Sequence, residues 1–295
     1  MKTKKILIAG AGGFVGQALK TYLSTKGYDV VPLSRTHKQG EIFFDVENEY
    51  INPDDISDSY AIISLSGENI FARWKASKKQ QILDSRVKSA RAISKAISLA
   101  KNPPKVFLCA SALGYYGTKT TDVVKEFSPN GDGFLAKVSA SWEDASRAFP
   151  TTSTKIVNAR FGVVLDNSGG FLQIVRKFLS IGVCPIFGLG ADEISWISLV
   201  DLCRALEWAI ERDDIEGAVN VCEPNFCTYS DFADAVGLLT KFSVPVKIPQ
   251  WIIKILLGEL SDELIFSNIR ATPNKLLQTG FYFQTPDIFS FIKTC

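Results

Sequence analysis

A glycine-rich loop near the start of the chain restricts the fold more than any other feature of the sequence. Four glycines fall within residues 10–16. The apolar segment 5–9 precedes them, and residues 15–23 carry apolar side chains at helical spacing. A strand that turns through small residues into a helix lets the backbone approach a pyrophosphate at the helix N-terminus. The residues expected to hold a dinucleotide are Gly10, Gly12, Gly13, Phe14, Val15 and Gly16.

The end of the next predicted strand, residues 29–33, indicates which dinucleotide binds. NAD-selective sites usually place Asp or Glu there, about 20 residues on, to accept a hydrogen bond from the ribose 2′-hydroxyl. Here Ser34 and Arg35 occupy that place. Arg35 can pair with a 2′-phosphate, and Ser34 can donate a hydrogen bond to it. The sequence therefore favours NADP over NAD as the cofactor; the alternative is that Arg35 is a solvated surface charge.

Strand-like and helix-like segments alternate along most of the chain. Besides the two strands above, apolar runs predict strands at 61–65, 105–109, 155–160 and 218–222. Apolar residues at helical spacing predict helices at 76–100, 133–148 and 200–211. This alternation predicts a Rossmann-type α/β fold, in which helices cover both faces of a doubly wound parallel sheet.

Two stretches break this alternation. Residues 169–198 interrupt it, and helices and a Phe-rich segment dominate after residue 222. We expect residues 1–222 to form the dinucleotide-binding domain, with 169–198 inserted into a smaller α/β substrate lobe. Residues 223–295 are expected to form a small C-terminal domain. Such a lobe would lie over the carboxyl edge of the sheet, where ligands of open α/β sheets bind.

Composition argues against several other classes of protein. The 295 residues carry a net charge of +2 with no long basic stretch, so no nucleic-acid partner is expected. No apolar run suits a membrane span or a secretory signal, which favours a cytoplasmic protein. The six cysteines form no CxxC pair and the chain has one histidine, so no metal site is expected. The expected partner is a small-molecule substrate, and a homodimer is left open.

Motifs along the whole chain resemble one known family. In order they are GAGGFVG (10–16), SLSGENI (64–70), RW (73–74), DSRV (84–87), SALGYYG (111–117), ARFGVVLDNSGG (159–170), SWIS (195–198) and LLGE (256–259). The sequence resembles the atypical extended short-chain dehydrogenase/reductases known as epimerase family proteins, or nucleoside-diphosphate-sugar epimerase-like proteins. The resemblance includes the small C-terminal domain peculiar to that family, and it implies an NAD(P)-binding Rossmann fold.

The resemblance also indicates where catalytic residues are expected and where two are missing. A typical member of the superfamily has a serine at a strand end, which positions the substrate oxygen, and a tyrosine with a lysine four residues later. Ser111 follows a predicted strand and fits the serine. If Trp142 and Glu143 match the family's Trp-Glu pair, the tyrosine position is Leu135 and the lysine position is Ser139. Neither can transfer a proton, a loss that the resembling family tends to share.

Other side chains are candidates for the missing proton chemistry. Tyr115 and Tyr116 lie on the loop that leaves a central strand, where ligands of such sheets bind. Arg86 on the preceding helix could supply the cation that tunes a tyrosine or holds a substrate anion. The alternative for both tyrosines is packing in the pocket wall, with their hydroxyls bonded to backbone.

Loops after neighbouring strands supply further candidate contacts. Cofactor contacts are expected from Ser64, Ser66 and Gly67, and substrate contacts from Asn69, Arg73 and Trp196. Together these features predict an NADP-dependent oxidoreductase or epimerase-like enzyme for a small polar substrate, with a sugar nucleotide as one candidate. Because the tyrosine and lysine are missing, the alternative is an NADP(H)-binding sensor or regulatory protein without turnover.

Overall fold

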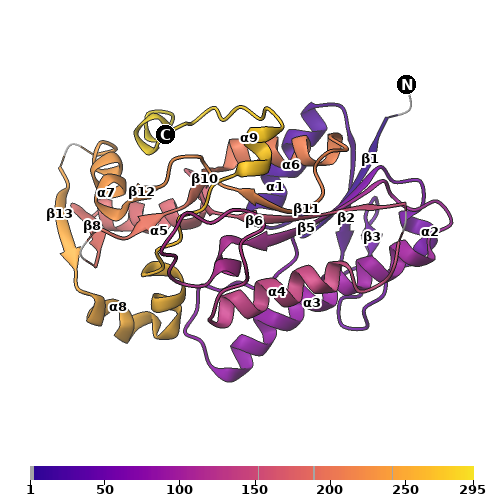
Figure 1. Cartoon of the computed structure of the whole chain (residues 1–295), viewed down its shortest axis with the longest axis horizontal. Coiled ribbons are helices and arrows are strands. Elements are labelled where there is room, and N and C mark those ends of the chain that lie inside the picture. Colours follow the sequence, from indigo (N-terminus) through magenta and orange to yellow (C-terminus); the bar gives the residue numbers. More distant parts are fainter. Residues whose placement is uncertain (1–2, 152, 189, 241) are drawn as a thin grey trace.

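A seven-stranded parallel sheet forms the centre of the computed structural model, which describes residues 3–151, 153–188, 190–240 and 242–295 (Figure 1). The strand order is β11-β6-β5-β4-β1-β2-β3, so the direction of winding reverses between β1 and β4. The strands are β1 (Lys5–Ala9), β2 (Asp29–Ser34), β3 (Ile42–Phe43), β4 (Ala61–Ser64), β5 (Val106–Ala112), β6 (Lys155–Phe161) and β11 (Gly217–Val221). The predicted doubly wound Rossmann-type sheet is confirmed.

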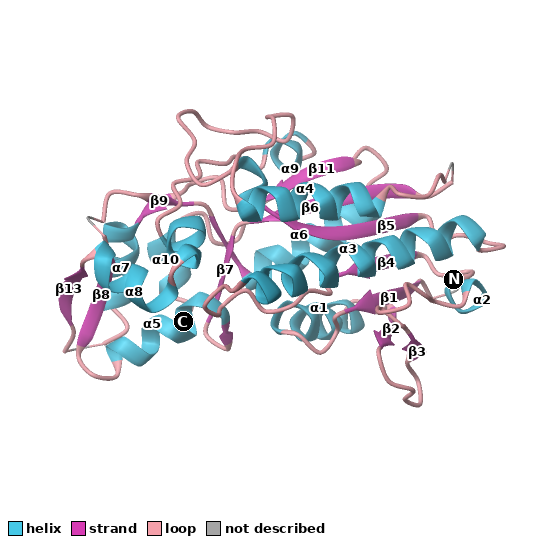
Figure 2. Cartoon of the chain, turned by 90° about the horizontal axis from the view of Figure 1, so that it is seen from below, coloured by secondary structure: helices cyan, strands magenta, loops and turns pink. Residues whose placement is uncertain are grey.

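Helices cover both faces of this sheet, which explains why its strands are apolar throughout. Successive residues of β1 point to opposite faces. Ile6 and Ile8 join a core with the helices α1 (Phe14–Thr25) and α6 (Leu199–Glu211). Leu7 joins the opposite core, with α3 (Ala76–Leu99) and α4 (Phe134–Ser146). Figure 2 shows α3 and α4 side by side along the face that is seen from below.

A second lobe lies beyond the carboxyl edge of the sheet, at the left of Figure 1. Its apolar core combines side chains from residues 165–196 and 227–295, including Phe171, Phe232 and Phe291. Three two-stranded ladders, β10–β7, β12–β9 and β13–β8, accompany it. Its elements are β7 (Val163–Asp166), α5 (Gly170–Leu179), β8 (Val183–Phe187), β9 (Glu193–Ile194), β10 (Trp196–Ser198), β12 (Cys227–Thr228), α7 (Tyr229–Gly237), β13 (Val244–Ile248), α8 (Gln250–Leu257), the π-helical turn η2 (Ser261–Ile265) and α10 (Ile288–Ile292).

After residue 222, where the sequence predicts the boundary between the two domains, part of the chain packs against the first lobe. Leu276 in α9 (Asn274–Gln278), with Phe281 and Phe283 after it, is buried in the core of the first lobe. These apolar side chains pack with α1 and α6, so the chain returns to the sheet before α10. The remaining short elements are α2 (Pro53–Ile56) and the 3-10 turn η1 (Leu113–Tyr116). In the described part of the chain, no helix combines the length and apolarity needed to cross a membrane.

Candidate functional site

The glycine loop between β1 and α1 is closed on its protein side and open on the other. Gly10 has a φ of +83°, and a Cβ there would lie 2.8 Å from the carbonyl carbon of Leu65. A Cβ at Gly16 would lie 2.1 Å from the carbonyl oxygen of Gly10, so α1 can start this close to the loop only with glycine at that position. A Cβ at Gly12 would meet nothing within 4 Å. The loop therefore leaves space in one direction, beside Gly12.

The start of α1 is suited to an anion. Its N-cap is Gly13, and no side chain caps the helix, so the first amide groups, at Phe14 and Val15, have no side-chain partner. Such amides and the positive end of the helix dipole favour a bound phosphate. Open space beside Gly12 and an uncapped helix are what a pyrophosphate needs, and the residues present fit a dinucleotide.

The end of β2 presents the two residues that favoured NADP. Ser34 is the last residue of the strand and is half-buried, and Arg35 is exposed beside it. Within the described residues, no carboxylate lies at ion-pair distance from Arg35. Its charge is therefore available to a ligand phosphate.

The loop after β4 packs against the glycine loop. A Cβ added at Gly10 would lie 2.8 Å from the carbonyl carbon of Leu65 and 3.0 Å from the amide nitrogen of Ser66. Ser66 is half-buried and Gly67 is exposed there. Ser64 differs from its expected role as a cofactor contact: it is fully buried, and its Oγ lies 3.4 Å from Oγ of Ser89 in α3. Its side chain points into the core because residue 64 belongs to the covered part of β4.

A cavity of about 420 Å³ lies between the two lobes. Its wall is mostly apolar, as is usual for small-molecule sites. The wall is formed in part by Phe14 and Val15 at the start of α1 and by Ser111 of β5. Leu135 and Ser139 of α4 also line it. The second lobe closes the cavity with side chains that include Phe171, Glu193, Tyr229 and Glu263. The cavity thus joins the glycine loop to the expected catalytic serine and to the two positions that lack tyrosine and lysine.

Arg86 is the only cation among the described residues that line this cavity. Its Nη1 donates to the backbone oxygens of Glu68 and Ile82, both at 3.0 Å, and its guanidinium lies 5.2 Å from the ring centre of Trp142. Burial lowers the pKa of Arg86 to about 10, which leaves it charged at neutral pH. It covers Gly67, where a Cβ would lie 3.0 Å from Cζ. No carboxylate in the described chain bonds to it directly, so it can attract an anionic group.

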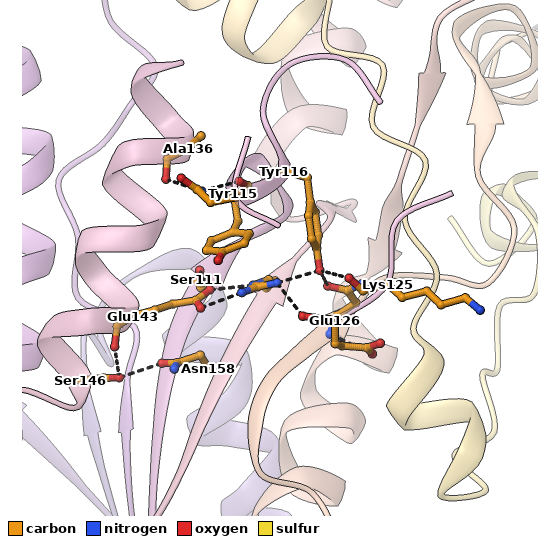
Figure 3. Close-up of polar contacts among 12 residues, drawn as sticks. Ser111, Tyr115, Tyr116, Lys125, Glu126, Ala136, Glu143, Ser146 and Asn158 are labelled. Carbon is orange, nitrogen blue, oxygen red and sulfur yellow. Dashed lines mark hydrogen bonds and ion pairs between the residues drawn. The ribbon is translucent and has the colours of Figure 1, made fainter. Parts of the chain in front are cut away.

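Ser111 lies within β5 and not after it, because the strand extends to Ala112. It is buried, and its Oγ donates to Oε1 of Glu143 at 2.8 Å. Arg160 on β6 holds both oxygens of the same carboxylate, with Nε at 2.7 Å from Oε1 and Nη2 at 2.9 Å from Oε2. Figure 3 shows this network, with Ser111 and Glu143 on one side of the guanidinium and Tyr116 on the other. Burial alone would lower the pKa of Arg160, but the hydrogen bond to Glu143 helps to raise it.

Sequence reasoning missed Glu143 and Arg160 as partners of Ser111. The available signal was one charge on the apolar face of α4 and another inside the strand β6, where both are buried. Buried charges need partners, so two opposite charges in neighbouring elements indicate a pair.

The position of Tyr116 does not support the role of proton donor that the sequence suggested. It does not line the cavity, and its hydroxyl lies 2.7 Å from Oδ1 of Asn220 and 2.9 Å from the backbone oxygen of Lys125. Nη1 of Arg160 also donates to it at 2.8 Å. Burial raises the pKa of Tyr116 to about 12 although Arg160 favours its ionised form. The tyrosine is a core residue because η1 turns its ring away from the cavity.

Tyr115 is half-buried and likewise absent from the cavity wall. The guanidinium of Arg160 lies over its ring, 3.5 Å from the ring centre. Such a contact is favourable electrostatically and packs the flat face of the guanidinium, while Glu143 bonds its edge. Tyr115 therefore supports the buried network through Arg160, and its position gives no support to a role in proton transfer.

The three expected substrate contacts lie away from the cavity wall. Asn69 and Arg73 are exposed, and Oδ1 of Asn69 accepts from the backbone amide of Phe71 at 2.8 Å. The apolar Ile70 and Phe71 between them line the cavity instead. Trp196 is 1% exposed, and its ring centre lies 5.6 Å from that of Phe291 in the core of the second lobe. That core excludes Trp196 from substrate because β10 turns its ring inward.

A carboxylate from the second lobe caps the helix that lines the cavity. Oε1 of Glu263 in η2 accepts from the amide of Phe134 at 2.7 Å, and Oε2 accepts from the amide of Leu135 at 3.0 Å. The two amides belong to the first turn of α4, where helix amides lack partners within the helix. The contact thus connects the two lobes at the cavity.

Family models match nearly the whole chain. The NAD-dependent epimerase/dehydratase family matches residues 6–222, and a domain of unknown function called DUF1731 matches residues 248–295. The first match covers the sheet with its glycine loop, and the second covers β13's end, α8 and the segments that follow.

Individual relatives cover the chain from end to end. The epimerase family protein Mb2239 of Mycobacterium bovis is 34% identical over 286 residues, which are 96% of this chain and 94% of the relative. The structure of human epimerase family protein SDR39U1 (isoform 2) with NADPH is similar with a TM-score of 0.89 and 28% identity, covering 98% of each chain. A nucleoside-diphosphate sugar epimerase from Corynebacterium glutamicum has a TM-score of 0.81 and 26% identity, over 99% of this chain and 58% of that one.

Proposed function

Since the chain belongs to the NAD-dependent epimerase/dehydratase family, whose fold binds NAD(P), we propose that it is an NADP-dependent oxidoreductase or epimerase-like enzyme. Its substrate is a small polar molecule. The observation that carries the proposal is that one cavity is lined both by the start of α1 and by Ser111. A cofactor held at the glycine loop would extend its reactive end into that cavity, beside the serine.

Each part of the site has its own role. A nicotinamide dinucleotide, when bound, carries the hydride. The amides at the start of α1 would hold its pyrophosphate, and Arg35 and Ser34 would hold the 2′-phosphate. Ser111 positions the substrate oxygen, and the apolar walls from both lobes exclude water from the reacting groups.

Arg86 supports a polar and anionic substrate. It is charged, lines the cavity and is bonded to backbone oxygens, so an anionic group of a ligand would meet an unneutralised guanidinium. A sugar nucleotide carries such a group, and the similar protein from C. glutamicum is a nucleoside-diphosphate sugar epimerase. We include sugar nucleotides in the proposal on these two grounds.

Cofactor choice is tested by comparing NADPH with NADH. We expect NADPH to raise the melting temperature more than NADH at equal concentration, because a ligand stabilises the folded state that binds it. Replacing Arg35 with Ala should weaken NADPH roughly tenfold, the loss of a charge-assisted hydrogen bond, and leave NADH unchanged. Lys38→Ala, which removes a nearby exposed cation, serves as the control. Equal shifts for both dinucleotides would contradict the choice of NADP.

Turnover is tested in both directions by following NADPH absorbance: with NADP and a panel of alcohols, including sugar nucleotides, and with NADPH and the matching aldehydes, ketones and keto-sugar nucleotides. An enzyme of this class should form or consume NADPH with at least one of them, and the rate should fall strongly in Ser111→Ala. If NADPH binds but no compound is oxidised or reduced, the proposal of an enzyme is wrong, and an NADP(H) sensor becomes the better description.

A further inference from the structure

Ser111 has one proton, and the structure shows where that proton goes. The Oγ–H donates to Oε1 of Glu143 at 2.8 Å, and the acceptor is a carboxylate whose two oxygens both accept from Arg160. A carboxylate held by a bidentate guanidinium is ionised and can only accept. The side chains of Glu143 and Arg160 are about 5% and 4% exposed, so water does not compete for these contacts.

The partners of Arg160 fix this arrangement from the other side. Its Nη1 donates to the hydroxyl of Tyr116 and to the backbone oxygen of Glu126, and its flat face rests on Tyr115. With its donors engaged on the side away from the cavity, the guanidinium cannot swing to release Glu143. Glu143 in turn keeps the proton of Ser111 directed into the protein.

The oxygen of Ser111 therefore presents lone pairs, and not its proton, to the cavity. Ser111 lines the cavity, and its Oγ has no hydrogen-bond partner besides Glu143 within the described residues. We propose that Glu143 and Arg160 hold Ser111 as a hydrogen-bond acceptor, so that this point of the cavity selects a ligand group that donates, such as an alcohol hydroxyl, over a carbonyl or ether oxygen. This inference rests on the proposed function only in taking the cavity to be the substrate site.

The consequence for ligand choice follows from hydrogen-bond chemistry. A ligand hydroxyl can donate a hydrogen bond to Ser111. A carbonyl oxygen would face the serine oxygen as a second acceptor, and it would lose its hydrogen bonds to water without gaining one from the protein. An accepting ligand could bind well only if Ser111 turned its proton away from Glu143 and toward the ligand, which would leave a buried carboxylate oxygen with one partner fewer. The ground-state substrate at Ser111 is therefore an alcohol.

The test uses two probes that cannot exchange hydride: 1-methylcyclohexanol, which can donate, and its methyl ether, which can only accept. Each is titrated into the full-length protein loaded with NADPH, and binding is followed by cofactor fluorescence. The expected result is roughly five- to tenfold tighter binding of the alcohol, the value of one hydrogen bond to a polarised acceptor. NADPH binding is measured first, so a failure of the proposed cofactor is seen separately.

Variants separate the hydrogen bond from the size of the probe. Ser111→Ala should remove the preference for the alcohol. Ser94→Ala removes an equally buried serine outside the cavity wall and should keep the preference. Glu143→Ala, checked for folding by its melting transition, removes the acceptor and frees the proton of Ser111 for the ligand, so the ether should gain relative to the alcohol. A merely structural role of Glu143 would weaken both probes alike.

Several outcomes would overturn the inference while NADPH still binds. One is an alcohol-to-ether ratio that is the same in the parent and in Ser111→Ala. Another is the absence of alcohol binding at millimolar concentration. A third is a loss of NADPH affinity in Ser111→Ala with an unchanged probe ratio, which would mean that the cofactor itself donates to the serine.

Discussion

The glycines of the dinucleotide loop differ in what they make possible. Gly16 lets α1 pack against the loop, since a Cβ there would overlap the carbonyl oxygen of Gly10. Gly12 meets open space and has no positive φ, so the fold itself does not require glycine at that position. The space beside Gly12 is the place expected for the pyrophosphate. Structure and ligand thus depend on different glycines of one motif.

Substitution separates these two dependencies. We expect Gly12→Val to abolish NADPH binding, because its side chain fills the ligand's space, with little change in melting temperature. Gly16→Ala should instead lower the melting temperature, because the backbone must move to accept the methyl group. Fluorescence titration and calorimetry measure the two effects. Unchanged NADPH affinity in Gly12→Val would contradict the placement of the cofactor.

The sequence predicted the position of a polar residue along its strand better than the direction in which its side chain points. That Ser64 and Ser111 lie near the carboxyl ends of β4 and β5 follows from the apolar runs before them. The direction of Tyr116 does not, because it depends on Asn220 and Arg160, which are distant in the sequence. Long-range pairing of buried groups, such as Glu143 with Arg160, needs the register of α4 against β6, which one sequence does not specify.

Where several elements of the second lobe meet the first, a buried acid cluster joins them. Glu223 follows β11, and Asp201 lies in the first turn of α6. The hydroxyl of Thr285 lies 3.0 Å from both carboxylates, and the amides of Gln284 and Thr285 donate to Asp201. Arg204 also binds Asp201. Burial, together with the nearby charge of Asp201, raises the pKa of Glu223 to about 8.

This raised pKa predicts a pH dependence of folding stability. The folded chain keeps a proton on Glu223 that the unfolded chain, with an ordinary value near 4.5, has lost. Its contribution is complete below about pH 4.5 and is lost as the pH rises towards 8. Urea unfolding between pH 5 and 8.5 should show this decline, and Glu223→Gln should reduce it. The exposed Glu47→Gln should not, and parallel curves for all three proteins would contradict the assignment.

The spacing of apolar residues predicts that a strand or helix exists, but not the residue at which it ends or the strand with which it pairs. The predicted strands and helices of the first lobe all exist, within a few residues of their expected ends. β5 extends to Ala112 because Ser111 and its neighbours continue the pairing with β6, which apolarity alone does not reveal. The ladder of β8 with β13 was not predicted, since its strands are 57 residues or more apart and partly exposed.

At the scale of the whole molecule, two acidic side chains connect the second lobe to helices of the first. Glu263 caps α4 at the cavity, and Glu259 forms an ion pair with Lys79 of α3 at the surface. The cap satisfies two backbone amides that have no partner within the helix. The surface pair is solvated, and such pairs contribute little to stability.

We therefore expect Glu263→Ala to lower the free energy of unfolding by about 1 kcal/mol or more, as the loss of a helix cap does. Glu259→Ala, the matched control, should change it by less than about 0.5 kcal/mol. Chemical denaturation measures both. Because α4 forms part of the cavity wall, Glu263→Ala should also weaken NADPH. Equal effects of the two substitutions would mean that the cap does not bind the lobes together.

The return of the chain to the sheet at α9 has a consequence for how such proteins can change over evolution. Because Leu276, Phe281 and Phe283 complete the core of the first lobe, the segment after residue 222 both covers the cavity and packs against the lobe that supports it. Removing this segment, or replacing it with an unrelated one, would expose the apolar side chains of α1 and α6 that it covers. New substrate preferences in this architecture must therefore arise by side-chain replacement within the lobe rather than by recombination of lobes.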